Sequence, residues 1–324
     1  MRAVVIGGTG HVGTYLVPRL VEAGHEVTVV TRGNRDPYSP HGAWRAVRRV
    51  ELDRTEEEAA GTFGPKIRDL EPDIVIDMIC FTLDSAQHLV EALRGHVQYF
   101  LHCSTCWVHG KTVTIPVTED QPRRPIGEYG IRKAAIEAYL HEEARRNGFP
   151  ATCVLPGHIV GPGWVPLNPA ANFNPDVYTR LASGKVITLP NQGLEIVHHV
   201  HADDVAQVFM RALQNWNLAV GESFHALSPA AMTLRGYAES VAGWFGQEAQ
   251  LEYKPFEAWR TDVDESDAEA TQSHLQHSPN CYSIAKSQRL LNYRPRYTSL
   301  QAVREAVTWL IDHGTVSVKP IGSR

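Results

Sequence analysis

The chain has 324 residues, of which 43% are hydrophobic and 21% charged, enough apolar material for one large domain or two. Its formal net charge of −5 argues against a nucleic-acid-binding protein, and no apolar run is long enough to span a membrane. Five cysteines spread over so long a chain exclude a small disulfide-built domain, so we expect a reduced, cytoplasmic protein.

The first 155 residues alternate short β-branched runs with stretches of helical character, a pattern typical of a parallel sheet covered by helices on both faces. The predicted strands are Ala3–Ile6, Glu26–Thr31, Ala46–Leu52, Ile74–Met78, Tyr99–Cys103 and Thr152–Leu155. The predicted helices are His11–Ala23, roughly Glu56–Leu70, Ser85–Arg94 and Tyr129–Asn147. Right-handed crossovers between these strands predict an α/β protein with a doubly wound parallel sheet, the Rossmann fold.

The regular alternation ends after Pro156, where a stretch rich in Pro and Asn, Val165–Pro175, indicates long loops. Residues 232–280 and 296–314 are largely helical in character, and Ser223–Leu227 is a candidate further strand of the sheet. We therefore expect a dinucleotide-binding domain of residues 1–160 with about 196–228. A smaller, mostly helical substrate lobe is expected from separated segments, about 161–195 and 229–315.

A glycine-rich turn joins the first predicted strand to the first predicted helix. Its glycines, Gly7, Gly10 and Gly13, have the spacing G-x-x-G-x-x-G. Gly7 permits a tight turn, Gly10 lets the backbone approach a pyrophosphate, and Gly13 lets the helix pack on the strand. The helix N-terminus offers free N–H groups to an anion. The context predicts a dinucleotide site, whereas the alternative is a structural turn.

The end of the second strand favours NADP over NAD. NAD sites usually carry an acidic residue at this tip to bind the ribose hydroxyls, but here Thr31 is followed by Arg32 and Arg35. Two cations suit a 2′-phosphate, although both can also be solvated loop residues. Asp53, after the third strand, is placed either for the adenine edge or as a helix cap.

A tyrosine and a lysine lie one helical turn apart in Tyr129-Gly130-Ile131-Arg132-Lys133, after Ser104-Thr105 at a strand end. With these motifs in this order, the chain resembles the extended (atypical) short-chain dehydrogenase/reductase superfamily. More closely, it is similar to the NAD-dependent epimerase/dehydratase family, which contains UDP-galactose 4-epimerase-like proteins. The resemblance covers nearly the full length. It also includes the stretches Ser104–Gly110, Pro156–Gly163, His201–Asp204 and Leu291–Pro295.

The resemblance implies a catalytic role for three residues. Tyr129 would be the general acid/base, Lys133 would stabilise its phenolate and hold the nicotinamide ribose, and Thr105 would bind the reacting oxygen. Hydride transfer belongs to the cofactor. The residues expected to contact the cofactor are Gly7, Thr9, Gly10, His11, Val12, Gly13, Thr31, Arg32, Arg35, Asp53, Cys80, Tyr129, Lys133, Pro156 and His158. The resemblance also implies a homodimer.

The chain departs from the family where those enzymes hold sugar nucleotides. Val197 stands at one expected diphosphate-binding arginine, and the region of Ser273 and His274 at the other. Cys106 and Trp107 replace the acid pair that dehydratases use, which argues against dehydration. We therefore expect a sugar or polyol-like small molecule without a diphosphate. The candidate substrate-binding residues are Phe81, Cys106, Trp107, His109, Trp164 and Phe173.

Sixteen histidines and a Cys-x-x-C spacing suggest metal or redox chemistry, but neither carries a convincing ligand set, and we expect no metal. His198-His199-x-His201 and Cys103…Cys106 are more simply structural or pocket-lining. The sequence thus predicts an NADP-dependent oxidoreductase or epimerase acting on a secondary alcohol or ketone carbon. The alternatives are a nucleotide-sugar 4-epimerase, or a dinucleotide-sensing regulator or RNA-binding relative without turnover.

Overall fold

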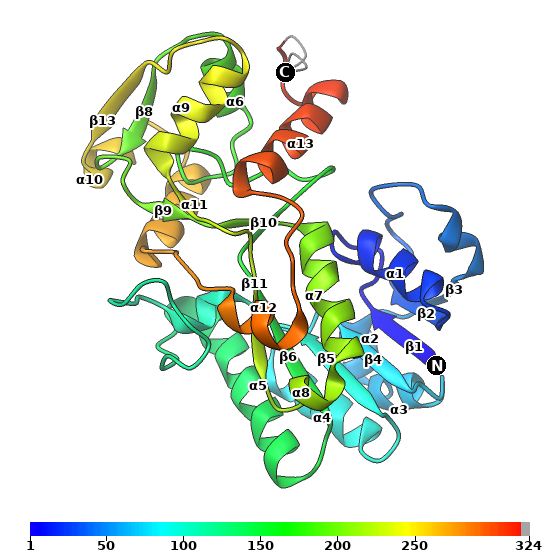
Figure 1. Cartoon of the computed structure of the whole chain (residues 1–324). Coiled ribbons are helices and arrows are strands. Elements are labelled where there is room, and N and C mark those ends of the chain that lie inside the picture. Colours follow the sequence, from blue (N-terminus) through cyan, green and yellow to red (C-terminus); the bar gives the residue numbers. More distant parts are fainter. Residues whose placement is uncertain (319–324) are drawn as a thin grey trace.

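A parallel seven-stranded sheet forms the centre of residues 1–318, the part of the chain that this computed structural model describes (Figure 1). Its strands are β1 (Arg2–Ile6), β2 (Glu26–Thr31), β3 (Arg48–Glu51), β4 (Ile74–Asp77), β5 (Tyr99–Cys103), β6 (Ala151–Pro156) and β11 (Ser223–Ala226). They lie in the order β11-β6-β5-β4-β1-β2-β3. The strand order reverses between β1 and β4, and ligands of doubly wound sheets bind at the carboxyl ends beside such a reversal.

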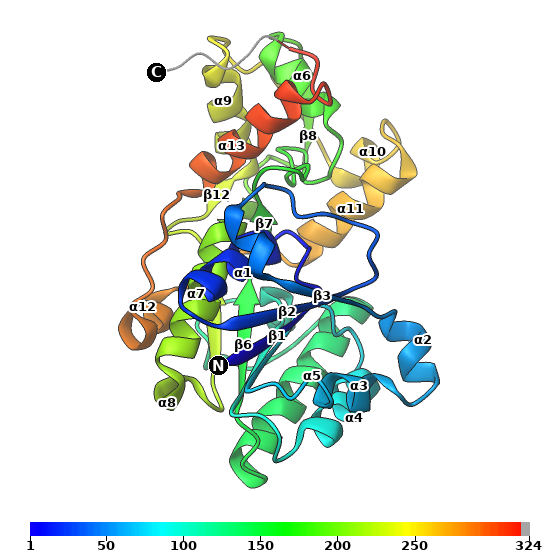
Figure 2. The same ribbon diagram turned by 90° about the vertical axis from the view of Figure 1, so that its right-hand side faces the viewer.

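Helices cover both faces of this sheet, because its strands other than the edge strand β3 are largely buried on both sides (Figure 2). In one group, α1 (Gly13–Glu22) packs against α7 (Ala202–Gln214). In the other, α4 (Leu83–Leu93) packs against both α3 (Phe63–Arg68) and α5 (Gly127–Arg146). The remaining elements of this part are α2 (Arg54–Ala59), α8 (Trp216–Ala219), α12 (Ala285–Leu291) and the 3₁₀ turns η1 (Gly42–Ala46) and η2 (Cys106–His109). The predicted Rossmann fold is confirmed.

One predicted helix is interrupted. Residues 56–70 form two short helices, α2 and α3, instead of one. Gly61, with φ +69°, adopts a conformation that a continuing helix does not permit, and α3 restarts after Thr62. The first turn of α2 is capped by Asp53, whose side chain accepts from the backbone N–H groups of Thr55 and Glu56.

A second hydrophobic core lies beyond the carboxyl ends of the sheet and includes Leu181, Val197, Tyr237 and Val303. Its helices are α6 (Asp176–Ala182), α9 (Leu234–Trp244), α10 (Phe256–Trp259), α11 (Glu265–Gln276) and α13 (Ser299–Asp312). Its strands form the pairs β8 (Ile187–Pro190) with β13 (Leu251–Lys254) and β9 (Ile196–Val197) with β12 (Met232–Thr233). Strands β7 (His158–Val160) and β10 (His199–His201) form a further parallel pair. The exact domain boundaries stay a prediction.

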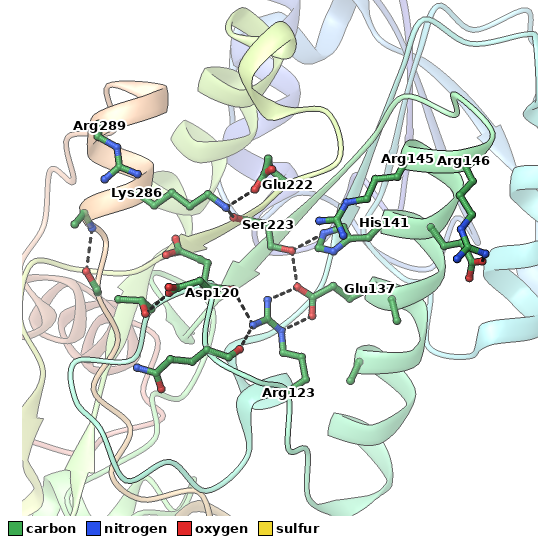
Figure 3. Close-up of a pocket in the computed structure, with 18 residues that line it drawn as sticks. Asp120, Arg123, Glu137, His141, Arg145, Arg146, Glu222, Ser223, Lys286 and Arg289 are labelled. Carbon is green, nitrogen blue, oxygen red and sulfur yellow. Dashed lines mark hydrogen bonds and ion pairs between the residues drawn. The ribbon is translucent and has the colours of Figure 1, made fainter.

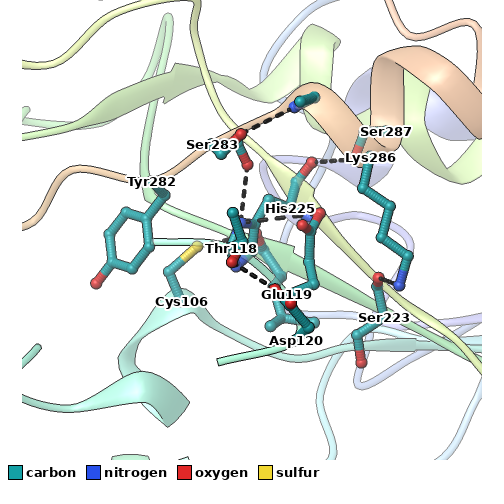
Figure 4. Close-up of polar contacts among 12 residues, drawn as sticks. Cys106, Thr118, Glu119, Asp120, Ser223, His225, Tyr282, Ser283, Lys286 and Ser287 are labelled. Atoms are coloured by element: carbon teal, nitrogen blue, oxygen red, sulfur yellow. Dashed lines mark hydrogen bonds and ion pairs between the residues drawn. The ribbon is translucent and has the colours of Figure 1, made fainter. Parts of the chain in front are cut away.

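Side chains cover the edge strand β11, which has no neighbouring strand on its outer side among residues 1–318 (Figure 4). The Glu119 carboxylate accepts from the N–H of His225, at 2.9 Å, and Ser287 donates to the carbonyl of the same residue. Lys286 donates to the carbonyl of Ser223. These bonds replace the missing strand, so the edge is not open to pairing with another chain.

Beside this edge, a cavity of about 1000 Å³ lies between α5 and α12 (Figure 3). A buried ion pair forms part of its wall: Arg123 binds both carboxylate oxygens of Glu137, at 2.9 and 2.7 Å. Arg123 also donates to the carbonyls of Glu119 and Gln121. Only 3% of the Glu137 side chain is exposed, so either partner alone would be a buried, uncompensated charge.

We predict that Glu137→Ala lowers the free energy of unfolding by about 3–5 kcal/mol, because it leaves the Arg123 guanidinium without its counter-charge. Urea denaturation measures the loss. The control is Glu142→Ala on the same helix, whose carboxylate pairs with Arg146 at the surface and should change stability by less than about 1 kcal/mol.

The pH dependence gives a second readout of the pair. Burial raises the pKa of Glu137, but the bonds from Arg123 outweigh it and leave the pKa below the ordinary value of 4.5. The stabilisation is therefore complete above that value and is lost as the pH falls through the folded-state pKa. Equal losses for the two variants, or an unchanged acid limb in Glu137→Ala, would contradict the assignment.

Candidate active site

The glycine-rich turn forms a close-fitting backbone cradle at the end of β1. Gly7 has φ +81°, and a Cβ built on it would meet Ile79 at 2.7 Å. A Cβ on Gly13 would lie 2.0 Å from the carbonyl oxygen of Gly8. Only glycine fits these two positions. No side chain therefore covers their backbone groups beside the first turn of α1. The cradle fits the pyrophosphate of a dinucleotide.

A groove of about 570 Å³ continues from this cradle along the carboxyl ends of β1, β2 and β4. It is lined by residues expected to contact the cofactor, namely Gly7, Thr9, Gly10, Thr31, Arg32, Arg35 and Asp53, and also by Ile6, Asn34, Arg54, Glu58, Phe63, Ile79 and Phe81. Thr9 and Thr31 bond to each other through their hydroxyls, at 3.2 Å. The shape and lining suit an extended dinucleotide.

Arg32, Arg35 and Asp53 are three of the charged residues at the β2–β3 end of the groove. Arg32 is exposed, and Arg35 donates from Nη1 to the hydroxyl of Tyr38, at 2.9 Å. Asp53 lines the groove, but one of its oxygens already caps α2. Both sequence interpretations of Asp53 therefore fit the structure, since its second oxygen has no hydrogen-bond partner among residues 1–318.

The three catalytic candidates meet beyond the ends of β4 and β5. Lys133, on α5, donates from Nζ to the backbone carbonyls of Cys80 and Cys103, each at 2.7 Å. Its ammonium also lies 4.9 Å from the ring centroid of Phe81, which lines the groove. Tyr129 lies one turn earlier on α5, and the Thr105 side chain is close enough to lower the pKa of its hydroxyl.

The hydroxyl of Tyr129 stays protonated near neutral pH. Burial raises its pKa to about 12, Cys103 acts in the same direction, and the bond to Thr105 opposes both. Burial also lowers the pKa of Lys133, which the nearby Cys103, Cys80 and Asp77 partly offset. A neutral phenol is the form that donates a proton to a carbonyl oxygen.

Aromatic rings form a wall next to Tyr129. Trp107 stacks on His277, with ring centroids 4.0 Å apart, and meets the rings of Tyr129 and His158 edge-on. His158 Nε2 lies 3.2 Å from Nδ1 of His274. Burial lowers the pKa of His274 to about 3, so this imidazole is neutral at pH 7. The wall is therefore aromatic and uncharged, and the predicted ligand contacts of Trp107 and His158 stay predictions.

Two of the expected substrate-binding residues are fully buried. His109 lies at the end of η2 and bonds through Nε2 to Nε2 of His225, at 2.9 Å, behind the edge strand. The Cys106 thiol donates to the carbonyl of Leu155. Neither side chain reaches a pocket, so their predicted substrate contacts are corrected here: both hold η2 against the sheet.

The remaining aromatic candidates are separated. Phe81 lines the dinucleotide groove, with Lys133 packed on its ring. The indole N–H of Trp164 donates to the hydroxyl of Tyr38, at 2.8 Å. Phe173 is half-exposed and has no ring contact with the wall among residues 1–318. Phe81 thus lines the groove, whereas Trp164 packs against His11 and Tyr38, so neither ring joins the aromatic wall around Trp107.

The side chains of four expected cofactor residues do not line the groove. The His11 ring packs on Trp164 and bonds through Nε2 to the carbonyl of Pro162, so it faces away from the groove. Val12 is buried at the start of α1, and Cys80 offers its carbonyl to Lys133. Pro156 ends β6 and is buried in the sheet.

The histidine run 198–201 bonds to protein groups. His198 and His199 bond through Nε2 to the carbonyls of Ser228 and Leu167, and His201 caps α7. Within residues 1–318, no group of three or more His, Cys, Asp or Glu side chains is arranged to hold a metal ion. The five cysteines are free thiols. Across the same residues, no helix is long and apolar enough to cross a membrane.

Sequence reasoning missed a buried ion pair in the groove wall, between Arg54 and Asp77. The signal was present: Asp77 ends an otherwise apolar strand, and a buried carboxylate needs a cation. It also missed His277, which packs on Trp107. No local pattern predicts that contact, because it joins residues 170 positions apart.

Comparison with known proteins identifies a family match. The profile of the NAD dependent epimerase/dehydratase family matches residues 3–225. A 2'-dehydrokanamycin reductase of Streptomyces kanamyceticus is 27% identical over 323 residues, which are 100% of this chain and 88% of the reductase. A chloroplast stem-loop binding protein of 41 kDa from Arabidopsis thaliana is 25% identical, over 97% of this chain and 80% of that protein.

Solved structures with the same fold include a UDP-glucose 4-epimerase from Thermotoga maritima, with UDP-glucose. Its TM-score is 0.74 at 20% identity, over 97% of this chain and 99% of that one. A UDP-glucuronic acid 4-epimerase from Bacillus cereus, in complex with UDP-glucuronic acid and NAD, has a TM-score of 0.73 at 17% identity, over 97% and 100%. At such identities the likeness shows the fold alone.

Proposed function

Because the chain belongs to the NAD dependent epimerase/dehydratase family, we propose that it interconverts a secondary alcohol and a ketone in a sugar- or polyol-like molecule. Enzymes of this family bind NAD(H) or NADP. One observation carries the proposal: Tyr129, with Thr105 near its hydroxyl, lies one turn from Lys133, whose ammonium packs on Phe81 in the wall of the dinucleotide groove. The full-length reductase relative, which acts on a sugar-derived ketone by its name, supports the reductive direction.

In this proposal each residue has a defined task at the reacting oxygen. The bound dinucleotide supplies or accepts the hydride at the carbon. Thr105 donates a hydrogen bond to the carbonyl oxygen, and Tyr129 delivers its proton to the same oxygen during reduction. Lys133, one turn further along α5, would hold the nicotinamide ribose through its ammonium and stabilise the phenolate left behind once the cofactor is bound. Trp107 offers an apolar ring for a sugar face.

We predict that Tyr129→Phe lowers turnover by at least ~10²–10⁴-fold while the Kd of the dinucleotide stays the same, because only the transferable proton is removed. The matched control is Tyr139→Phe on the same helix, which lies outside the catalytic group. Steady-state kinetics and calorimetric titration measure both variants. Unchanged turnover in Tyr129→Phe would refute the role, and binding without any turnover in the unmodified protein would favour a dinucleotide-sensing regulator.

We also propose that NADP is the preferred cofactor. Arg32 and Arg35 line the groove at the tip of β2, and no carboxylate follows Thr31 there. Guanidinium groups bind phosphate through charge-assisted, often bidentate hydrogen bonds. Arg35 already donates to Tyr38, so Arg32 is the cation with no competing partner among residues 1–318.

We predict that Arg32→Ala weakens NADP binding by about 1.5–3 kcal/mol and leaves NAD binding nearly unchanged. Arg45→Ala serves as the control, because this exposed arginine follows the same loop but does not line the groove. Calorimetry with both dinucleotides gives the comparison. Tighter binding of NAD than of NADP to the unmodified protein would contradict the proposal.

The substrate proposed here has no nucleoside diphosphate. Val197 is fully buried at one position expected for a diphosphate-binding arginine, and the neutral His274 bonds to His158 near the other. A diphosphate next to these residues would lose its water without gaining a cation. The aromatic wall of Trp107, His158 and His277 suits a neutral sugar ring instead.

We predict turnover with keto-sugars or polyols and neither micromolar binding nor 4-epimerisation of UDP- or dTDP-sugars. A thermal-shift and turnover panel on the NADP-loaded protein makes the test. Epimerisation of a nucleotide sugar would support the alternative, a nucleotide-sugar 4-epimerase.

The proposal includes a cytoplasmic homodimer. Five free cysteines agree with a reducing compartment, and the exposed Ile131 on α5 agrees with a helix that packs against a second copy.

A further inference from the structure

The hydroxyl of Tyr38 joins two loops that lie far apart in the sequence. It accepts from Nη1 of Arg35, in the loop after β2, at 2.9 Å, and from Nε1 of Trp164, in the loop after β7, at 2.8 Å. Both nitrogens are donors, so a single oxygen accepts two hydrogen bonds. We call Arg35, Tyr38 and Trp164 the clasp, because the loss of this one hydroxyl would separate the two loops.

Ring and backbone contacts hold the clasp in one position. The Trp164 ring lies 4.3 Å from that of His11 between centroids, and the Tyr38 ring lies 5.3 Å from the same imidazole. Gly163 has φ +94°, and a Cβ on it would collide with the Tyr38 ring, so only glycine fits here. The backbone N–H of Tyr38 donates to Oγ1 of Thr14 on α1, at 3.1 Å. The clasp is therefore fixed against the first turn of α1.

The two ends of the clasp reach different parts of the ligand space. Arg35 lines the dinucleotide groove, whereas Tyr38 and Trp164 do not. A guanidinium has five N–H donors, and Arg35 gives one of them to Tyr38, so the others can bind an anion. The loop of Trp164 follows β7, which begins at His158 of the aromatic wall, and continues into Val165, which packs on the second hydrophobic core. The Tyr38 hydroxyl thus connects the groove with the substrate lobe.

We propose that Tyr38 is a positioning residue that couples binding of the cofactor's 2′-phosphate at Arg35 to the placement of loop 161–164 and of the substrate lobe that follows it. Tyr38 holds the guanidinium in place, so less side-chain entropy is lost when the phosphate binds. The coupling is reciprocal: a phosphate that keeps Arg35 on Tyr38 also stabilises Trp164 on the same hydroxyl. NAD, which has no 2′-phosphate, leaves the coupling unused. The inference rests on the proposed dinucleotide binding and extends it to residues outside the groove.

Calorimetric titration with NADP and NAD tests the coupling from the far end of the clasp. Trp164→Phe keeps a ring on His11 but removes the indole N–H, and Tyr38→Phe keeps the ring on Gly163 but removes the hydroxyl. Each should weaken NADP binding roughly five- to ten-fold and leave the Kd of NAD nearly unchanged. The double variant should bind NADP no more weakly than Tyr38→Phe, because both bonds end on one oxygen.

The matched control is Trp216→Phe, which changes an exposed tryptophan on α8 outside the groove and should alter neither Kd. Hydrogen exchange with each dinucleotide at saturation gives a second readout that a merely structural role would not move. NADP should slow amide exchange in residues 161–174 more than NAD does, and Tyr38→Phe should abolish this difference. Equal weakening of both dinucleotides by the clasp variants, or NADP-specific protection that survives in Tyr38→Phe, would overturn the proposal.

The proposed NADP preference is judged separately, on the unmodified protein. Equal Kd values for the two dinucleotides would contradict that preference, whereas the coupling would still hold if NADP alone protected residues 161–174 through Tyr38. Conversely, tighter NADP binding that neither Tyr38→Phe nor Trp164→Phe alters would overturn the coupling and leave the preference intact. An unmodified protein that binds neither dinucleotide would contradict both.

Discussion

The ammonium of Lys133 joins the elements that make this site. It is buried and donates to two backbone carbonyls, that of Cys80 after β4 and that of Cys103 at the end of β5. A buried cation needs such acceptors, since isolation from water costs far more than a hydrogen bond returns. The two bonds fix α5 against the ends of neighbouring strands. Tyr129, one turn earlier on the same helix, is thereby held at Thr105, which follows β5.

The charges divide the ligand space into two parts. At the β2–β3 end, Arg32, Arg35 and the Arg54–Glu58 pair face the groove, so this end suits an anionic, hydrogen-bonding nucleotide. Around Tyr129 the contacts are aromatic rings and neutral imidazoles, and no charged group acts on the pKa of this tyrosine. This separation supports the proposed combination of a charged cofactor with an uncharged substrate.

Much of the fold was predictable because it follows from local pattern. The apolar strands, the glycine turn Gly7–Gly13 and the helical spacing of Tyr129 and Lys133 each depend on neighbouring residues. What failed depends on tertiary contacts. The sequence around His109 suggests a pocket residue, but His225 on β11 bonds to its ring and keeps it buried. Trp164 bonds to Tyr38, which lies 126 positions earlier in the chain. Arg54 opens a polar helix, so nothing local indicates that its guanidinium is buried against Asp77.

The most direct test of the account follows the hydride itself. A candidate keto-sugar is incubated with the protein and NADPH that carries deuterium at C4 of the nicotinamide, and the product is analysed by mass spectrometry and NMR. The account predicts one deuterium on the carbinol carbon of the product with the unmodified protein, and none with Tyr129→Phe in the same time. The test uses NADPH labelled in turn on each face of C4. Product that carries no deuterium with either labelled cofactor, or equal labelling by both proteins, would contradict hydride transfer at the Thr105–Tyr129–Lys133 centre.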